Sequence, residues 1–145
     1  MPPSLEQLSR EGRAGPDSLR GLRIVVVDDE ADVRELLSEV LASWGAEVRI
    51  AANAGGARDL LAAQTPDVLI SDIGMPDEDG YSLIRSIRHS ASIETSRVPA
   101  IAVTAFGAPA DRARALAEGF NVHMTKPVPP RVLADAVLKM VASAA

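Results

Sequence analysis

Five short apolar runs alternate along this chain with five segments whose apolar residues recur at helical spacing. The first run, LRIVVV at residues 22–27, is rich in β-branched residues and apolar on both faces, as in a strand covered on both sides. Residues 33–44 then repeat apolar side chains along one stripe, which is typical of an amphipathic helix. Gly45 favours the end of that helix, because glycine readily adopts the backbone conformation found there.

The other four strand–helix pairs follow in the same order. Strands are predicted at residues 46–51, 66–72, 98–105 and 121–127, and helices at residues 53–64, 81–90, 108–120 and 129–143. Residues 74–80 and 91–97 are expected to be loops. Alternation with short connections predicts parallel strands joined by right-handed crossovers, with helices on both faces. The fold class is therefore α/β, with a doubly wound, five-stranded parallel sheet.

The start of the chain lacks this periodicity. It carries Pro2, Pro3, Pro16 and three glycines among scattered charges. We expect residues 1–21 to form a flexible arm or linker. Residues 22–145 then form one domain, which suits a chain of 145 residues.

The composition excludes several classes of function. The net charge of -5 argues against a nucleic-acid surface and against electrostatic attachment to a membrane. The chain has no cysteine, so disulfides, thiolate metal sites and cysteine nucleophiles are excluded. No apolar run approaches the roughly 20 residues of a spanning helix, and the N-terminus has no signal-peptide core. We expect a cytoplasmic protein without nucleic acid or membrane as a partner.

Polar residues collect where the predicted strands end. Asp28 and Asp29 follow the first strand, and Asp72 ends the third. Thr104 and Lys126 stand at the ends of the fourth and fifth strands. In an open parallel sheet, ligands bind beyond the carboxyl ends of the strands. Three carboxylates, a hydroxyl and an ammonium are therefore predicted at one edge.

Such a group of carboxylates needs a cation. Two carboxylates about 4 Å apart repel by roughly 4 kcal/mol at an effective dielectric near 20. Lys126 can offset one charge, and a divalent ion with oxygen ligands, Mg²⁺, Mn²⁺ or Ca²⁺, can offset the rest. These groups are the parts needed for phosphoryl transfer, with a carboxylate able to act as nucleophile. No nucleotide-binding motif is present.

Four motifs together resemble the receiver domain of two-component response regulators. They are VVVDDE, LISDIGMPDEDG, VTA and HMTKP, in this order at the ends of successive strands. The resemblance covers residue 22 to about residue 142. It implies the flavodoxin-like (βα)5 fold with strand order 2-1-3-4-5. The stretch GFNVHMTKPV resembles receivers attached to hybrid histidine kinases.

The resemblance implies roles for the acids. Asp72 would accept the phosphoryl group. Mg²⁺ would be held by Asp28, Asp29 and Asp72, with Asp29 the more direct ligand of the first pair. Gly74 would add its backbone carbonyl as a metal ligand.

The remaining roles belong to the later strands. The resemblance implies that Thr104 binds a phosphoryl oxygen and reports phosphorylation by moving, while Lys126 pairs with the phosphate. The switch aromatic of the family lies three residues before this lysine, where this chain has His123. Phe106 is apolar where some relatives are polar, and we expect it to slow attack of water on the acyl phosphate.

The implied function is a signalling switch. It would take a phosphoryl group from the phosphohistidine of a histidine kinase or phosphotransfer protein. It would catalyse only its own phosphorylation and dephosphorylation, so it is not an ordinary enzyme. No output domain follows in this sequence, so output is expected through contacts with another protein. A stand-alone regulator, a relay intermediate and a segment of a hybrid kinase all remain open.

Two other classes of function also remain open. One is a scaffold with the receiver fold that never takes phosphate. The other is a haloacid-dehalogenase-type phosphatase with an aspartate nucleophile, although that family has a second aspartate where this chain has Gly74.

The fourth predicted helix, residues 108–120, is rich in alanine and buries little area. Because such an element opens at low cost, we expect this helix, the fifth strand and the last helix to form the face that phosphorylation remodels. A weak homodimer through this face is left open. Tyr81 is expected to be partly exposed, and Arg112 and Arg114 to lie on a solvated face.

Overall fold

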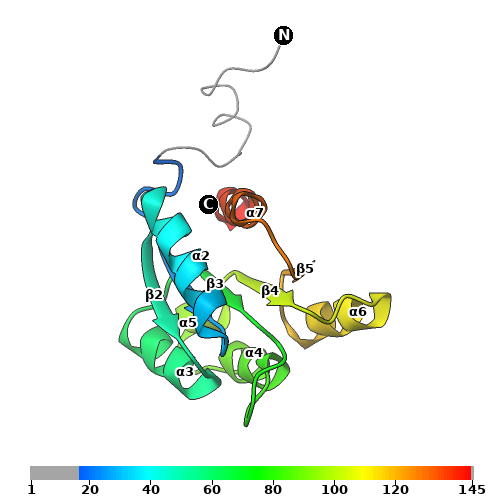
Figure 1. Ribbon diagram of the computed structural model, residues 1–145. Coiled ribbons are helices and arrows are strands. Elements are labelled where there is room, and N and C mark those ends of the chain that lie inside the picture. The colour runs from blue at the N-terminus through cyan, green and yellow to red at the C-terminus, as the bar shows by residue number, and fades with distance from the viewer. Residues whose placement is uncertain (1–16, 145) are drawn as a thin grey trace.

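The computed structural model describes residues 17–144, which form one parallel sheet with helices on both faces (Figure 1). The strands are β1 (Arg23–Val27), β2 (Glu47–Ala51), β3 (Val68–Ser71), β4 (Ala100–Thr104) and β5 (Val122–Thr125). Their order is β2-β1-β3-β4-β5, and every neighbouring pair is parallel. The predicted fold class and strand order are confirmed.

Six helices lie in the described part of the chain. They are α2 (Ala31–Ser43), α3 (Ala54–Ala63), α4 (Gly80–Arg88), α5 (Ile93–Ser96), α6 (Pro109–Glu118) and α7 (Pro130–Ala144). The Asn53 side chain caps α3 by accepting from the Gly56 N–H at 2.8 Å. Gly45 follows α2 with a φ of 102°, a conformation that glycine adopts without strain.

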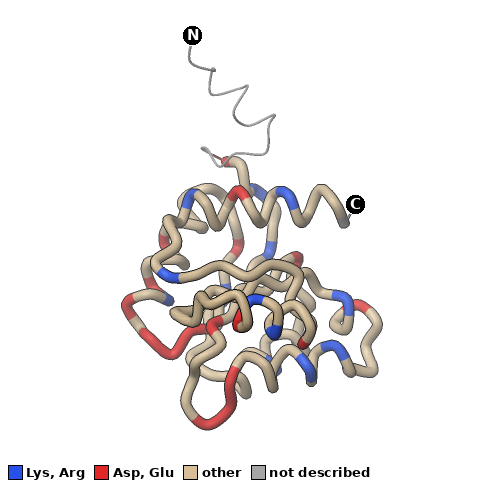
Figure 2. The backbone as a smooth tube through the Cα atoms, turned by 90° about the vertical axis from the view of Figure 1, so that its right-hand side faces the viewer, with Lys and Arg blue, Asp and Glu red and all other residues tan. Residues whose placement is uncertain are grey.

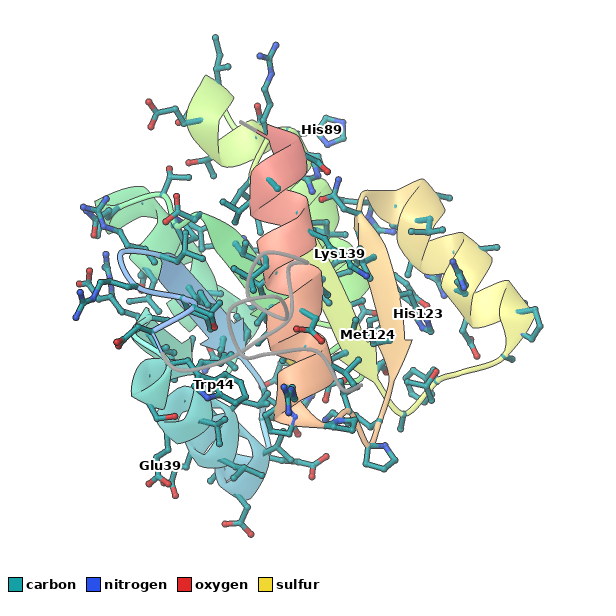
Figure 3. All side chains as sticks on the ribbon, turned by 90° about the horizontal axis from the view of Figure 1, so that it is seen from above. Glu39, Trp44, His89, His123, Met124 and Lys139 are labelled. Atoms are coloured by element: carbon teal, nitrogen blue, oxygen red, sulfur yellow. The ribbon has the colours of Figure 1, made fainter. Side chains whose placement is uncertain are left out.

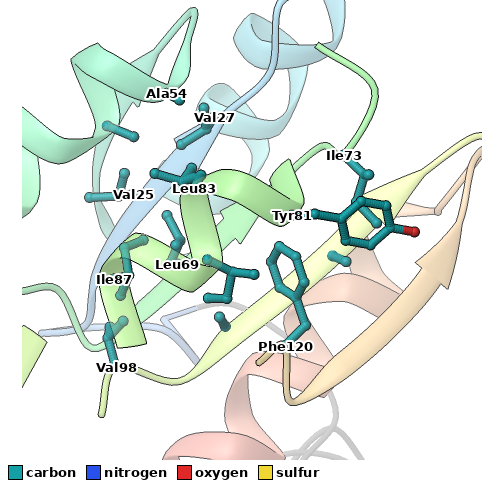
Figure 4. Close-up of a cluster of buried hydrophobic side chains, with 14 of the residues drawn as sticks. Val25, Val27, Ala54, Leu69, Ile73, Tyr81, Leu83, Ile87, Val98 and Phe120 are labelled. Atoms are coloured by element: carbon teal, nitrogen blue, oxygen red, sulfur yellow. The ribbon is translucent and has the colours of Figure 1, made fainter. Parts of the chain in front are cut away.

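The alternation of side chains along β1 divides the core between the two faces of the sheet. Val25 and Val27 join the cluster beneath α3 and α4, whereas Ile24 and Val26 join the cluster beneath α2 and α7. All four are almost fully buried, which explains why this strand is apolar on both faces. Figure 4 shows the first of these clusters.

The strands are shorter than predicted by a few residues, and two segments differ in kind from the predictions. Residues 91–97 were expected to be a loop but include α5, a single helical turn capped by the Ser92 hydroxyl. Four residues are too few to produce a periodic apolar pattern. The turn before β1 also belongs to the domain, because Leu19 is fully buried and its N–H donates to the Trp44 carbonyl at 2.9 Å. The rest of the predicted arm, residues 1–16, lies outside the described residues.

Charged residues are distributed around the domain. Figure 2 shows lysines and arginines interspersed with acidic residues over the described chain. Between residues 17 and 144, no helix combines the length and the apolar character required to span a bilayer.

Candidate phosphoacceptor and metal site

The two central strands place buried carboxylates at the same edge of the sheet. Asp28 follows β1 and is 3% exposed, and Asp72 follows β3 and is 6% exposed. Each backbone extends the sheet by one residue: the Asp28 N–H donates to the Ala51 carbonyl at 3.2 Å, and the Asp72 N–H donates to the Val27 carbonyl at 2.9 Å. The sheet itself therefore fixes the positions of both acids.

Lys126 brings a cation to these acids from the end of β5. Its Nζ lies 2.9 Å from Asp28 Oδ2 and 3.0 Å from Asp72 Oδ2. Its backbone N–H donates to the Thr104 carbonyl at 2.8 Å, which anchors it beside β4, and the Lys126–Pro127 peptide bond is cis. The structure thus brings Asp28, Asp72 and Lys126 together, as their order along the sequence predicts.

Burial and charge act on these groups in opposite ways. Burial raises the pKa of the Asp28 carboxyl above its ordinary value, although hydrogen bonds from Lys126 and the Glu30 N–H lower it in part. Burial also disfavours the Lys126 ammonium, but its hydrogen bonds to Asp28 and Asp72 outweigh this effect and raise its pKa. The lysine is therefore charged at neutral pH, and one cation serves two carboxylates.

The acids fit a divalent cation. Carboxylate oxygens of Asp28, Asp29 and Asp72 lie within 4.8 Å of one another, with Asp29 exposed and the other two buried. Carboxylate oxygens without histidine or cysteine are suited to Mg²⁺, which retains waters and binds through one or two carboxylates.

Gly74 lies against the ring of Phe106. A Cβ added at Gly74 would come within 2.9 Å of Phe106 Cε2, so a side chain here would displace the ring. Phe106 itself is 49% exposed. The aromatic ring therefore lies beside the loop that follows Asp72.

Thr104 and His123 hold the backbone of this phenylalanine. Thr104 is buried, and its Oγ1 accepts from the Phe106 N–H at 3.3 Å. The His123 Nε2 lies 2.9 Å from the Phe106 carbonyl oxygen, and because a carbonyl only accepts, the histidine donates. Figure 3 shows His123 on the side of β5 toward α6, and Met124 on the side of α7. The two predicted switch residues thus meet at one loop.

Two residues of the site were missed. Glu30 donates its N–H to Asp28 Oδ1 at 2.9 Å and places its carboxylate 3.6 Å from Lys126 Nζ. Arg34 donates to the Asp28 carbonyl oxygen at 2.7 Å. Glu30 directly follows Asp28 and Asp29 in the sequence, and this position could have predicted that it belongs to the site. Arg34 lies on the first turn of α2 and belongs to no motif.

Comparison with known proteins agrees with this geometry. Residues 24–138 match the response regulator receiver domain family. An uncharacterised 14.6 kDa protein in the sodA1 3′ region of Leptolyngbya boryana is 45% identical over 113 residues, which cover 78% of this chain and 85% of that protein. The transcriptional regulatory protein GltR of Pseudomonas aeruginosa is 36% identical over 116 residues, 80% of this chain.

The chain spans only part of other relatives. It covers 47% of GltR, and 9% of the hybrid signal transduction histidine kinase D of Dictyostelium discoideum, which is 32% identical over 97% of this chain. The solved signal receiver domain of a signal transduction histidine kinase from Syntrophus aciditrophicus superposes with a TM-score of 0.76 at 30% identity, over 85% of this chain and 92% of that one. This chain therefore belongs to the response regulator receiver domain family of two-component systems.

Proposed function

We propose that this chain is a phosphorylation-dependent switch in which Asp72 accepts a phosphoryl group from the phosphohistidine of a histidine kinase or phosphotransfer protein. One observation carries the proposal: Asp72 is a buried carboxylate 3.0 Å from the Lys126 ammonium, with an oxygen within 4.8 Å of the other two acids. A carboxylate can act as a nucleophile toward phosphorus, and a cation beside it can offset the charge of the incoming phosphoryl group.

In the transfer, an oxygen of Asp72 forms a bond to phosphorus while the bond from phosphorus to the donor's imidazole nitrogen breaks. The electron pair of that bond returns to the donor's ring. The Ile73 N–H donates to Asp72 Oδ1 at 2.7 Å and fixes the orientation of the carboxylate. Lys126 is placed to exchange its contact with Asp72 for the incoming phosphoryl oxygens. The Thr104 hydroxyl is proposed to donate to one of them.

We propose Mg²⁺ as the cofactor, held by Asp28, Asp29, Asp72 and the Gly74 carbonyl. When bound, Mg²⁺ neutralises the charge that develops on the transferring phosphoryl group. The clustered carboxylate oxygens support this choice.

The output is proposed to act through protein contacts on the face formed by α6, β5 and α7. β5 is an edge strand of the sheet, and a groove of about 690 Å³ between β5 and α7 is lined by Val122, Met124, Val132 and Met140. Of the α6 residues only Ala115 is buried, which supports rearrangement of this face at low cost. A weak homodimer is a second use that the same face would allow.

Intact mass spectrometry tests the acceptor. After incubation with Mg²⁺ and a small-molecule phosphodonor, the wild type is expected to gain one phosphoryl group and Asp72→Asn none. Asp59→Asn, which alters an exposed aspartate on α3, is the matched control and should behave as the wild type. Absence of both phosphorylation and Mg²⁺ binding would favour the scaffold, and turnover of a generic phosphate ester would favour the phosphatase.

A further inference from the structure

The helix α6 has little apolar attachment to the rest of the domain. Among its ten residues only Ala115 is buried. Its neighbour α4 buries five of nine residues and belongs to the core. The apolar attachments of this segment are Ala115 and, just after the helix, Phe120, so apolar packing holds its C-terminal end but not the rest of α6. Other contacts must define where α6 lies.

One such contact joins the middle of α6 to the start of α4. The guanidinium carbon of Arg114 lies 4.0 Å from the centroid of the Tyr81 ring, within the range of a cation–π interaction. Tyr81 is 5% exposed and not partly exposed as predicted. Arg114 is exposed, as predicted, and in addition lies over the Tyr81 ring. Figure 4 shows Tyr81 beside Ile73 at the margin of the buried cluster.

Two further arginines on α4 reach the end of α6. Arg85 forms an ion pair with Glu118, in the last turn of α6. The Arg88 Nε donates to the Gly119 carbonyl at 2.9 Å, directly after the helix. A cation at a helix C-terminus is favourable because the terminal carbonyls carry partial negative charge. We call the contacts of Arg85, Arg88 and Arg114 the arginine seam.

The start of α4, which carries Tyr81, lies against the backbone of Asp72 and Ile73. Tyr81 follows Gly80, whose N–H donates to the Ile73 carbonyl at 2.8 Å. A Cβ added at Gly80 would lie 2.4 Å from the Asp72 carbonyl oxygen, so the first turn of α4 is packed directly against the acceptor backbone. Tyr81 also lines a cavity of about 280 Å³ with Gly74, Phe106 and Arg114. This cavity leaves room for movement between the acceptor loop and α6.

We propose that the arginine seam sets the position of α6, and that the Arg114–Tyr81 contact is its link to the acceptor loop. The inference deepens the proposed function, since it names the contact through which the state of Asp72 reaches the output face. The ion pair and the cation at the helix end weaken as salt is raised, whereas apolar packing does not. α6 is therefore held by contacts that can be exchanged without opening the core.

Hydrogen exchange of α6 amides in the full unphosphorylated chain tests the seam. Arg114→Gln is expected to speed exchange about two- to fivefold, the effect of losing one partly exposed cation–π contact. Arg112→Gln, on the same helix and exposed, is the control and should leave exchange unchanged. Tyr81→Phe should also leave it unchanged because the ring remains, and Arg114→Lys should restore part of the loss. Equal exchange rates in Arg114→Gln and Arg112→Gln would refute the proposal that the arginine seam sets the position of α6.

A second arm tests the coupling. In phosphorylated wild type, α6 exchange is expected to change, and in phosphorylated Arg114→Gln the change should be smaller. An identical response in both would overturn the link while leaving the acceptor role of Asp72 intact. If Asp72 takes no phosphoryl group, the proposed function and the link fail together, and the unphosphorylated comparison still decides whether the seam holds α6.

Discussion

Replacing Lys126 with methionine removes the ammonium between two buried carboxylates but keeps a side chain of similar length. Nζ lies 2.9 Å from Asp28 Oδ2 and 3.0 Å from Asp72 Oδ2. At an effective dielectric near 20, each contact corresponds to about 5 to 6 kcal/mol of gross Coulomb attraction. Desolvation offsets much of this, and removing one partner of a buried pair costs about 3 to 5 kcal/mol. Since the Lys126 side chain is 17% exposed, we expect the substitution to lower the free energy of unfolding by about 3 kcal/mol in the absence of metal.

Two conditions should reduce that loss. Mg²⁺ neutralises the same carboxylates and no longer competes with an ammonium, so it should stabilise Lys126→Met more than the wild type. A lower pH should also reduce the loss of stability in Lys126→Met. Burial already raises the pKa of Asp28, and without the lysine's hydrogen bond that pKa rises further. A raised carboxyl pKa means that the folded state binds more protons, so the variant recovers stability relative to the wild type as the pH falls.

Urea unfolding with and without MgCl₂ measures both effects. Lys139→Met, which changes an exposed lysine on α7, is the control for loss of one positive charge. We expect a large shift of the unfolding midpoint for Lys126→Met alone, and a shift that Mg²⁺ mostly removes. The reasoning is refuted if the two variants are equally stable without metal, or if Mg²⁺ leaves the deficit of Lys126→Met unchanged.

Four shorter predictions follow from the same structure. Phe106→Glu should shorten the lifetime of the phosphorylated protein, followed by intact mass, and an unchanged lifetime would contradict the shielding role of the ring. Gly80→Ala should lower the free energy of unfolding by about 1 to 3 kcal/mol, because its Cβ would strike backbone 2.4 Å away. Gly55→Ala, whose Cβ would have its nearest neighbour at 3.5 Å, should instead stabilise by up to about 1 kcal/mol. The hydrogen bond from Arg58 lowers the pKa of the Glu78 carboxyl below its ordinary value, so Arg58→Gln should lower the free energy of unfolding at neutral pH and lose that effect as the pH falls through the lowered pKa.

The sheet was predictable because its signals are local. The β-branched runs of β1 and β3 are apolar on both faces, and parallel register then brings Asp28 and Asp72 to one edge without further information. The same reasoning could not tell Asp28 from Asp29. In the structure Asp28 is the buried one and Asp29 is exposed, and the partner of Asp28, Lys126, lies far away in the sequence.

The wrong predictions concern residues whose surroundings come from distant segments. Tyr81 stands near the start of a helix, where an aromatic residue is often half exposed, but it is buried as part of the core cluster on this face of the sheet, with Arg114 over its ring. Leu19 has no periodic neighbours, so it was assigned to the arm, yet it packs beneath Trp44 in the core. The four residues of α5 are held by a Ser92 cap that resembles any turn in sequence. Each of these three features depends on contacts with other parts of the chain, which a local sequence pattern does not reveal.

The two sides of Asp72 differ in how tightly they are packed. This difference predicts where the structure would change if Asp72 were phosphorylated. On the sheet side, the Asp72 N–H is bonded to β1 and Gly80 is packed against the Asp72 backbone, so no movement is possible without breaking close contacts. On the α6 side, Phe106 is half exposed beside a cavity, and α6 is held by arginine contacts that solvent can replace. A new charge at Asp72 must be accommodated by the side that yields at lower cost. That side carries Thr104, His123 and α6, so the response should appear there, whichever protein reads it.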